Sequence, residues 1–181
     1  PAKRPEPLDR FALVGAFKPM ATQPQPQGAT TSVSRVIKAP RAAVYQAFLD
    51  AEAVATWLAP ETMKGTVHTF EPYAGGTIRM SLTYQNPAEA PHTSGKSSAD
   101  TDTFQGKIMA LVPNEKIVWV TEFESDDPQY AGAMTLIWSF VDAEGGTEVT
   151  VVCENIPRGI RPEDNEDGSR STLEKLAAFL E

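Results

Sequence analysis

The sequence predicts an α+β protein in which a curved antiparallel sheet of six or seven strands surrounds one long C-terminal helix. Two short helices are expected after the first strand. Three observations predict this class. Nearly every apolar run before Cys153 and Glu154 alternates with the two-residue period of a strand. Turn-forming residues separate these runs at hairpin spacing. The last stretch, from Pro162 to Glu181, has helical periodicity instead.

The domain is expected to open with a strand and two short helices. A β-rich run predicts a strand over Thr31–Lys38. Pro40 fits the first turn of a helix, and apolar residues recur there at helical spacing: Ala43, Val44, Ala47 and Phe48. Asp50 can cap a second helix that runs to Leu58, where Pro60 ends it.

Six more strands are expected to follow as consecutive hairpins. They are predicted over Thr66–Glu71, Thr77–Tyr84, Asp102–Leu111, Lys116–Phe123, Ala133–Val141 and Thr147–Glu154. Four connections carry typical turn residues: Gly75-Gly76, Pro113-Asn114, Asp126-Asp127-Pro128 and Gly145-Gly146. The longest interruption, Asn86–Ala99, is rich in Pro, Ser and Gly and is predicted to be a mobile surface loop.

The chain divides into an N-terminal extension or linker, residues 1–28, and one domain, residues 29–181. Six of the 15 prolines lie within residues 1–26, and Pro24–Gly28 is typical of a flexible or polyproline linker. Two alternatives concern the extension. Phe11–Phe17 could dock on the domain or on a second subunit of a homodimer, and Met20 could mark the start of translation.

Composition narrows the classes of function. The net charge of -8 and pI of about 4.8 disfavour nucleic acid and anionic membranes as partners, because both attract basic patches. No apolar run approaches the roughly 20 residues that span a bilayer. The single cysteine, Cys153, excludes an internal disulfide and is compatible with a reducing cytoplasm. We therefore expect a cytoplasmic protein.

The predicted architecture implies a cavity, because one helix cannot cover the whole sheet. Seven strands spaced about 4.8 Å apart make a sheet on the order of 30 Å across. A helix is only about 10–12 Å wide. Aromatic side chains either fill the remaining space or line a pocket there: Trp57, Tyr84, Phe104, Trp119, Phe123, Trp138 and Phe140.

The closing helix has two different halves. Its C-terminal half carries a buried apolar stripe of Leu173, Leu176, Ala177 and Leu180, whereas its first half offers polar or small residues. This first half is predicted to roof the cavity, unless it rests directly on aromatic side chains. The predicted ligand-binding residues are Trp57, Tyr84, Phe104, Trp119, Trp138, Asn165, Ser169 and Thr172.

A series of short segments carries a family resemblance over residues 31–181. The segments are Val36–Pro40 with Val44, Tyr45 and Phe48; Trp57 and Pro60; Tyr73–Gly76; Phe104–Ile108; Pro113–Val118; Gly146–Val151; and Gly168 with Leu173 and Leu176. In this order and spacing they resemble the helix-grip fold of the START-like (SRPBCC) superfamily, and more narrowly the activator of heat-shock-protein ATPase homologue family. The resemblance implies an internal hydrophobic cavity, with functions that range from ligand binding to chaperone assistance and catalysis.

One position departs from the family pattern. The family often carries an aromatic residue directly after the helix glycine, whereas this chain has Ser169. The departure predicts a more polar helix side for any pocket. The heat-shock activator proper also has a separate chaperone-binding domain, and residues 1–28 are too short to form one.

The ionisable residues favour binding over catalysis. Neither His68 nor His92 has a second ligand at conventional metal-binding spacing, so no metal or cofactor is expected. Cys153 alternates with Val149 and Val151 and is expected to be a small buried hydrophobe. The strand carboxylates Glu122, Glu148 and Glu154 are expected to face solvent; if Glu122 and Glu154 instead faced inward, with Arg79, they could do acid–base chemistry.

The sequence therefore predicts a protein that binds a small apolar or amphipathic molecule between the sheet and the C-terminal helix. Two alternatives remain open at this point. One is a cyclase, hydrolase or isomerase that uses a pocket carboxylate. The other is a stress-related, co-chaperone-like interaction module, which would present an exposed apolar patch rather than a deep pocket.

Overall fold

The computed structural model describes residues 28–86, 88 and 95–181. The segment Phe11–Phe17 and His92 lie outside the described residues. The elements, in chain order, are β1 (Ala29–Ile37), α1 (Arg41–Ala47), α2 (Ala51–Trp57), β2 (Met63–Phe70), β3 (Thr77–Tyr84), β4 (Thr101–Val112), β5 (Lys116–Phe123), the 3-10 helix η1 (Pro128–Tyr130), β6 (Met134–Ala143), β7 (Gly146–Ile156) and α3 (Pro162–Leu180).

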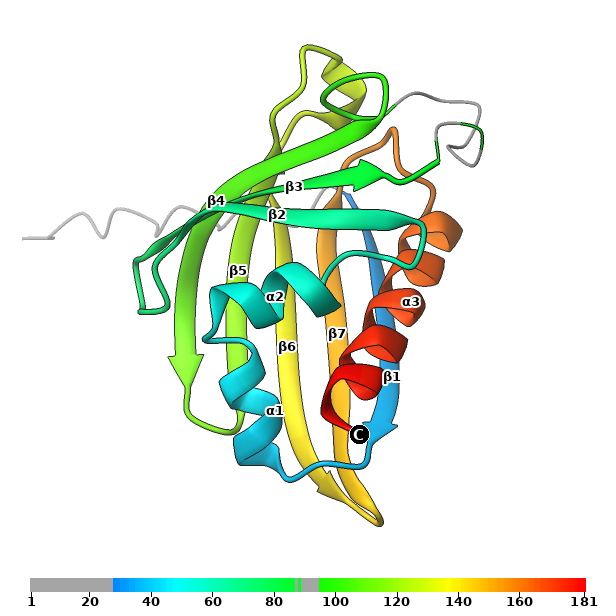
Figure 1. Ribbon diagram of the computed structural model, residues 1–181. Coiled ribbons are helices and arrows are strands. Elements are labelled where there is room, and N and C mark those ends of the chain that lie inside the picture. Colours follow the sequence, from blue (N-terminus) through cyan, green and yellow to red (C-terminus); the bar gives the residue numbers. More distant parts are fainter. Residues whose placement is uncertain (1–27, 87, 89–94) are drawn as a thin grey trace, which may run out of the picture.

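The predicted fold class is confirmed. A single antiparallel sheet contains all seven strands in the order β1-β7-β6-β5-β4-β3-β2. Every pair except β1 with β7 joins strands that are consecutive in the chain. α1 and α2 follow the first strand, and α3 closes the chain and packs along β1 (Figure 1).

Bulges and tight turns curl this sheet around the helices. The register shifts between Ala29 and Thr31 in β1, between Val67 and Thr69 in β2, and between Ile108 and Ala110 in β4. A bulge bends its strand and increases the local twist. Figure 1 accordingly shows β2 and β3 running across the direction of β6 and β7. The concave face therefore has two ends, one beside α1 and one beside the start of α3.

Three local features differ from the prediction or refine it. β2 begins at Met63 rather than Thr66, because the end of β3 needs partners and Met63 pairs with Tyr84. Asp50 caps α2 as expected, since its carboxylate accepts a hydrogen bond of 2.7 Å from the backbone N–H of Ala53. The short 3-10 helix at Pro128–Tyr130 was not predicted.

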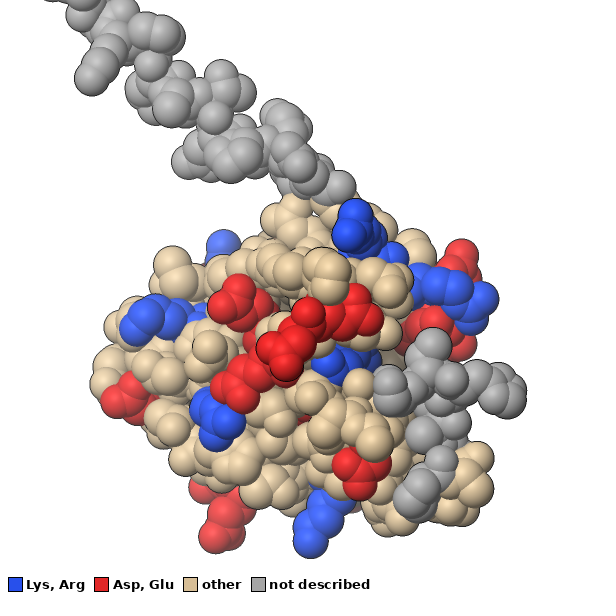
Figure 2. All heavy atoms as spheres, turned by 90° about the horizontal axis from the view of Figure 1, so that it is seen from above, with Lys and Arg blue, Asp and Glu red and all other residues tan. Residues whose placement is uncertain are grey.

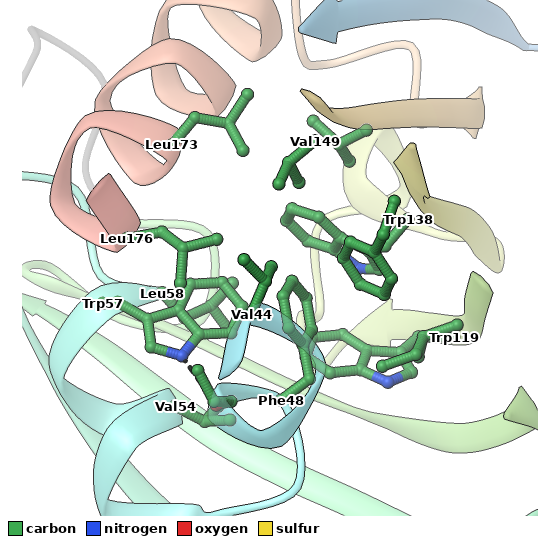
Figure 3. Close-up of a cluster of buried hydrophobic side chains, with 14 of the residues drawn as sticks. Val44, Phe48, Val54, Trp57, Leu58, Trp119, Trp138, Val149, Leu173 and Leu176 are labelled. Carbon is green, nitrogen blue, oxygen red and sulfur yellow. Dashed lines mark hydrogen bonds between the residues drawn. The ribbon is translucent and has the colours of Figure 1, made fainter. Parts of the chain in front are cut away.

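The solid part of the core lies at the α1 end of the concave face. Phe48 is 1% exposed and stands between three indole rings, with ring centroids 4.4 Å from Trp57, 5.1 Å from Trp138 and 6.1 Å from Trp119 (Figure 3). Leu173 and Leu176 of α3 are buried in the same cluster. The C-terminal half of α3 is thus an anchor in the core, as its apolar stripe predicts.

Among the described residues, no helix is both long and apolar enough to cross a membrane.

Candidate functional site

A cavity of about 870 Å³ occupies the other end of the concave face. It lies between the sheet, the end of α2 and the first half of α3, because the Phe48 cluster fills only the α1 end. Its buried wall is largely apolar and includes Leu58, Met63, Phe104, Trp119, Met134, Trp138, Val151 and Cys153. Such a size and lining fall within the range of small-molecule sites in proteins, about 300–1,000 Å³.

Seven of the eight predicted site residues lie on this wall. They are Tyr84, Phe104, Trp119, Trp138, Asn165, Ser169 and Thr172. Their role in binding a ligand stays a prediction. Trp57 does not line the cavity: its side chain is fully buried, and its indole N–H donates a 2.9 Å hydrogen bond to the carbonyl oxygen of Ala47. We therefore leave Trp57 out of the proposed site.

The first half of α3 roofs the cavity without filling it. A Cβ atom added to Gly168 would have no heavy atom within 4 Å. Two hydrogen bonds hold this part of the helix to the segment after α2: Thr172 Oγ1 donates to the carbonyl oxygen of Leu58 at 3.1 Å, and Ser171 Oγ accepts from the backbone N–H of Glu61 at 3.1 Å. The roof thus has open space beneath Gly168, whereas Leu173 and Leu176 pack into the core.

The two indoles on the cavity wall have no hydrogen-bond acceptor among the described residues. Trp119 is 1% exposed and Trp138 is 2% exposed, and neither indole N–H has a partner within the described parts of the chain. Their rings contact one another and Phe48. Since buried donors are nearly always paired, these two N–H groups are unusual features of the site.

Cys153 lies on the same wall as a buried thiol. Burial raises the pKa of this thiol, and hydrogen bonding with Thr31, Ser169 and Asn165 opposes the shift only in part. Thr31 Oγ1 itself donates to Asn165 Oδ1 at 2.6 Å. The thiol therefore stays protonated at neutral pH, as expected for a structural cysteine rather than a nucleophile.

This environment predicts that Cys153 reacts slowly in the folded protein. At pH 8 we expect iodoacetamide to alkylate the native protein markedly more slowly than the urea-unfolded protein, because the raised pKa lowers the thiolate fraction and the thiol is only 2% exposed to the reagent. Mass spectrometry of timed, acid-quenched samples measures both rates, and the native rate should still be rising above pH 9. Equal native and unfolded rates would contradict the placement of Cys153.

An ion pair that the sequence analysis missed lies on the cavity wall near its mouth. Asp102 is 3% exposed and accepts two hydrogen bonds of 2.5 Å from Lys96, one from the backbone N–H and one from Nζ. The Lys96 ammonium also lies 5.1 Å from the ring centroid of Phe123. The β4 alternation, which places Asp102 on the same face as Phe104, was a usable signal for Asp102. Lys96 belongs to an irregular segment and gave none.

The mouth of the cavity is charged and mainly acidic. Exposed Glu61, Asp164 and Asp167 line it, together with Arg161, which forms a 2.7 Å salt bridge with Asp164. Figure 2 looks onto this end of the molecule and shows a band of acidic side chains across it. Burial, and secondarily the charges of Asp102 and Asp164, raise the pKa of the Tyr84 phenol, so it stays protonated.

The residues considered for acid–base catalysis, Arg79, Glu122 and Glu154, do not line the cavity, and neither do His68 and Glu148. Glu122, Glu148 and His68 are exposed. Arg79 instead forms a bidentate ion pair with Glu124: its Nε donates to Oε1 at 2.6 Å and its Nη2 donates to Oε2 at 2.9 Å. Across residues 28–86, 88 and 95–181, no three His, Cys, Asp or Glu side chains are grouped to hold a metal ion.

Solved structures share this architecture. A crystal structure of a protein from Chromobacterium violaceum has a TM-score of 0.72 at 31% identity, and the match covers 83% of this chain and 96% of that one. A solution structure of a protein from Arthrobacter aurescens has a TM-score of 0.68 at 15% identity, covering 87% and 89%. The AHSA1-like protein from Aeromonas hydrophila has a TM-score of 0.62 at 16% identity, covering 83% and 91%. The last two show the fold alone.

The sequence itself also matches a family model, although none of the curated proteins compared with the chain matches the chain. The family model described as "Activator of Hsp90 ATPase homolog 1-like protein" matches residues 38–181, which include every element from α1 to α3. The chain therefore belongs to the Activator of Hsp90 ATPase homolog 1-like family, within the START-like superfamily.

Proposed function

We propose that the protein binds a small apolar or amphipathic molecule in the cavity beneath the first half of α3. The observation that carries this proposal is the cavity itself: about 870 Å³ with a buried wall of aromatic and aliphatic side chains. A wall of this kind favours transfer of apolar surface out of water, by about 25 cal/mol per Å². The charged mouth can contact a polar end of the ligand.

We expect affinities in the micromolar range. Drug-sized ligands gain a net free energy of about 0.3 kcal/mol per non-hydrogen atom. A ligand of about 25 such atoms would then gain about 7.5 kcal/mol, close to the 8.2 kcal/mol of a 1 μM dissociation constant.

Binding can be tested with N-phenyl-1-naphthylamine, a neutral apolar fluorophore whose emission rises in apolar surroundings. We expect saturable binding at one molecule per chain with a micromolar Kd, because the apolar wall excludes water from the dye. Native mass spectrometry of protein purified from cells should also show a non-covalent adduct. Bare protein together with no saturable fluorescence change would contradict the proposal.

Nothing in the described residues favours the other two functions as strongly. The charge of Asp102, a buried carboxylate on the cavity wall, is already neutralised by Lys96. The large exposed apolar side chains are spread over β1, the β2–β3 turn, β4, β6 and α3: Val36, Tyr73, Met109, Val112, Val141 and Phe179. The cavity, by contrast, gathers apolar side chains from many elements at one place.

A further inference from the structure

The domain begins beside the roof of the cavity. Ala29, the first residue of β1, pairs with Ile156 at the end of β7, so Gly28 lies at the same end of the molecule as the start of α3 (Figure 1). Thr31 Oγ1 donates a hydrogen bond of 2.6 Å to Oδ1 of Asn165, which lines the cavity. Three residues of extended chain span about 10 Å. The chain therefore enters the domain close to the cavity mouth.

The sequence before Gly28 contains one apolar run with a basic residue on each side. Residues 11–17 read Phe-Ala-Leu-Val-Gly-Ala-Phe, and the flanking residues are Arg10 and Lys18. We call residues 10–18 the basic apolar segment. The chain from Lys18 to Gly28 can extend over about 33–36 Å, which exceeds the width of a seven-stranded sheet, about 30 Å. The connecting chain is therefore long enough for this segment to reach the mouth.

The basic apolar segment and the cavity mouth have opposite charges. The ionisable residues of the segment are both basic, whereas residues 161–170, at the start of α3, carry four acidic and two basic side chains, and Glu61 adds a negative charge. Figure 2 shows the resulting acidic band. Residues 1–28 as a whole have four basic and two acidic residues, whereas residues 29–181 have 12 basic and 22 acidic ones. Electrostatic attraction therefore favours contact between the segment and the mouth.

The cavity supplies apolar surface that can remove the side chains of residues 11–17 from water. Its buried wall is formed by aromatic and aliphatic side chains. Covalent connection to the domain gives a tethered segment an effective concentration in the millimolar range. A segment with a dissociation constant of about 0.1 mM as a free peptide would then be docked for about nine-tenths of the time. Even weak contacts are therefore sufficient for occupancy.

We propose that the basic apolar segment docks at the cavity mouth of its own chain, with apolar side chains inside the cavity and with Arg10 and Lys18 against the acidic residues of the mouth. The docked segment competes with the ligand and so regulates access to the site. The competition rests on the proposed function, whereas the docking itself does not.

Titration of the full chain with N-phenyl-1-naphthylamine tests the competition. We call the protein with Phe11→Ser and Phe17→Ser the double serine variant. It should bind the fluorophore about three- to tenfold more tightly than wild type, because a segment that is docked for about two-thirds to nine-tenths of the time reduces the apparent affinity by that factor. The matched control, Gln23→Ser with Gln25→Ser, changes two polar residues of the connecting chain and should stay within about twofold of wild type.

Salt tests the ionic part of the docking. Arg10→Gln with Lys18→Gln should also tighten fluorophore binding at low salt, because it removes the attraction to the acidic mouth. This difference from wild type should disappear at about 1 M NaCl, where the Debye length is only about 3 Å. A difference that persists unchanged at high salt would contradict the ionic contacts.

A nitroxide label on Pro7→Cys tests docking without any ligand. In a ¹H–¹⁵N correlation spectrum, the label should broaden the amide signals of Asp164 and Gly168, which line the cavity, much more than that of Gly145 in the β6–β7 turn at the other end of the molecule. Cys153 is buried and should react slowly with the label. The double serine changes in the same labelled chain should remove most of the broadening.

The outcomes separate this proposal from the proposed function. Equal broadening with and without the double serine changes, or equal fluorophore affinities of wild type and the double serine variant, would overturn the docking proposal. Nitroxide-labelled protein without ¹⁵N can also be mixed with unlabelled ¹⁵N protein; broadening in that mixture would place the segment on a second copy and overturn docking within one chain. The proposed function fails separately if the fluorophore binds neither wild type nor the double serine variant.

Discussion

Replacement of Phe48 by alanine is expected to lower the free energy of unfolding by about 3–5 kcal/mol, the usual cost of truncating a buried phenylalanine. Phe48 is 1% exposed and contacts Trp57, Trp119, Trp138 and Phe140 at the point where α1 meets the sheet. Its removal leaves a void that these large, mutually packed rings cannot fill. Urea unfolding, followed by circular dichroism and tryptophan fluorescence, measures the change.

A matched substitution tests whether this loss comes from the core. Phe179→Ala removes the same side chain from α3, where it is 45% exposed, and should change stability by no more than about 0.5 kcal/mol. Phe48 also supports the indoles of Trp119 and Trp138, which line the cavity. The Phe48 variant should therefore bind the fluorophore more weakly even where it stays folded. If Phe48→Ala lowered the free energy of unfolding by as little as Phe179→Ala does, the result would contradict the described core.

Replacement of Gly168 by tryptophan is expected to weaken fluorophore binding at least about tenfold, which is about 1.4 kcal/mol. Gly168 lies on the cavity wall, and an added Cβ meets open space there. A large side chain at this position would occupy the volume beneath the roof and compete with the ligand. Titration with N-phenyl-1-naphthylamine, with far-ultraviolet circular dichroism to verify folding, gives the result.

The control for this variant is Gly168→Ala, which leaves almost all of the cavity volume. Alanine is favoured over glycine within a helix by about 0.5–1 kcal/mol, and no atom stands in its way. We therefore expect higher stability and fluorophore binding within about twofold of wild type. Unchanged binding by a folded Gly168→Trp protein would show that the fluorophore occupies a different place.

The sequence was sufficient to predict the helices and strands because the residue patterns that specify them are local. Strand alternation, the turn residues and the cap at Asp50 act within a few residues, and the structure has all seven strands and three α-helices where they were predicted, apart from shifted ends. The ends differ from the predicted ones where pairing with a neighbouring strand sets the length of an element: β2 starts at Met63 because β3 continues to Tyr84. The periodicity of its apolar residues likewise predicted that α3 has a polar first half and a buried second half.

The candidate site was predicted in part for the same reason. Alternation identifies which side chains share a face of the sheet, but it left open whether the aromatic residues Phe104, Trp119 and Trp138 fill the core or line a pocket. It cannot say how far along the concave face the core extends. Trp57 has the same residue type as Trp119 and Trp138, yet it packs under Phe48 and hydrogen bonds to Ala47.

The sequence by itself determined the order of elements, the curved antiparallel sheet and the need for a space beside the closing helix, because these follow from local periodicity and from the widths of a sheet and a helix. Only the tertiary structure decided where that space lies, which indoles border it without an acceptor, and that Lys96 pairs with Asp102 there. The physical reason is that packing joins residues far apart in the chain. One aromatic cluster around Phe48 fills one end of the concave face, and the other end is left to form the cavity.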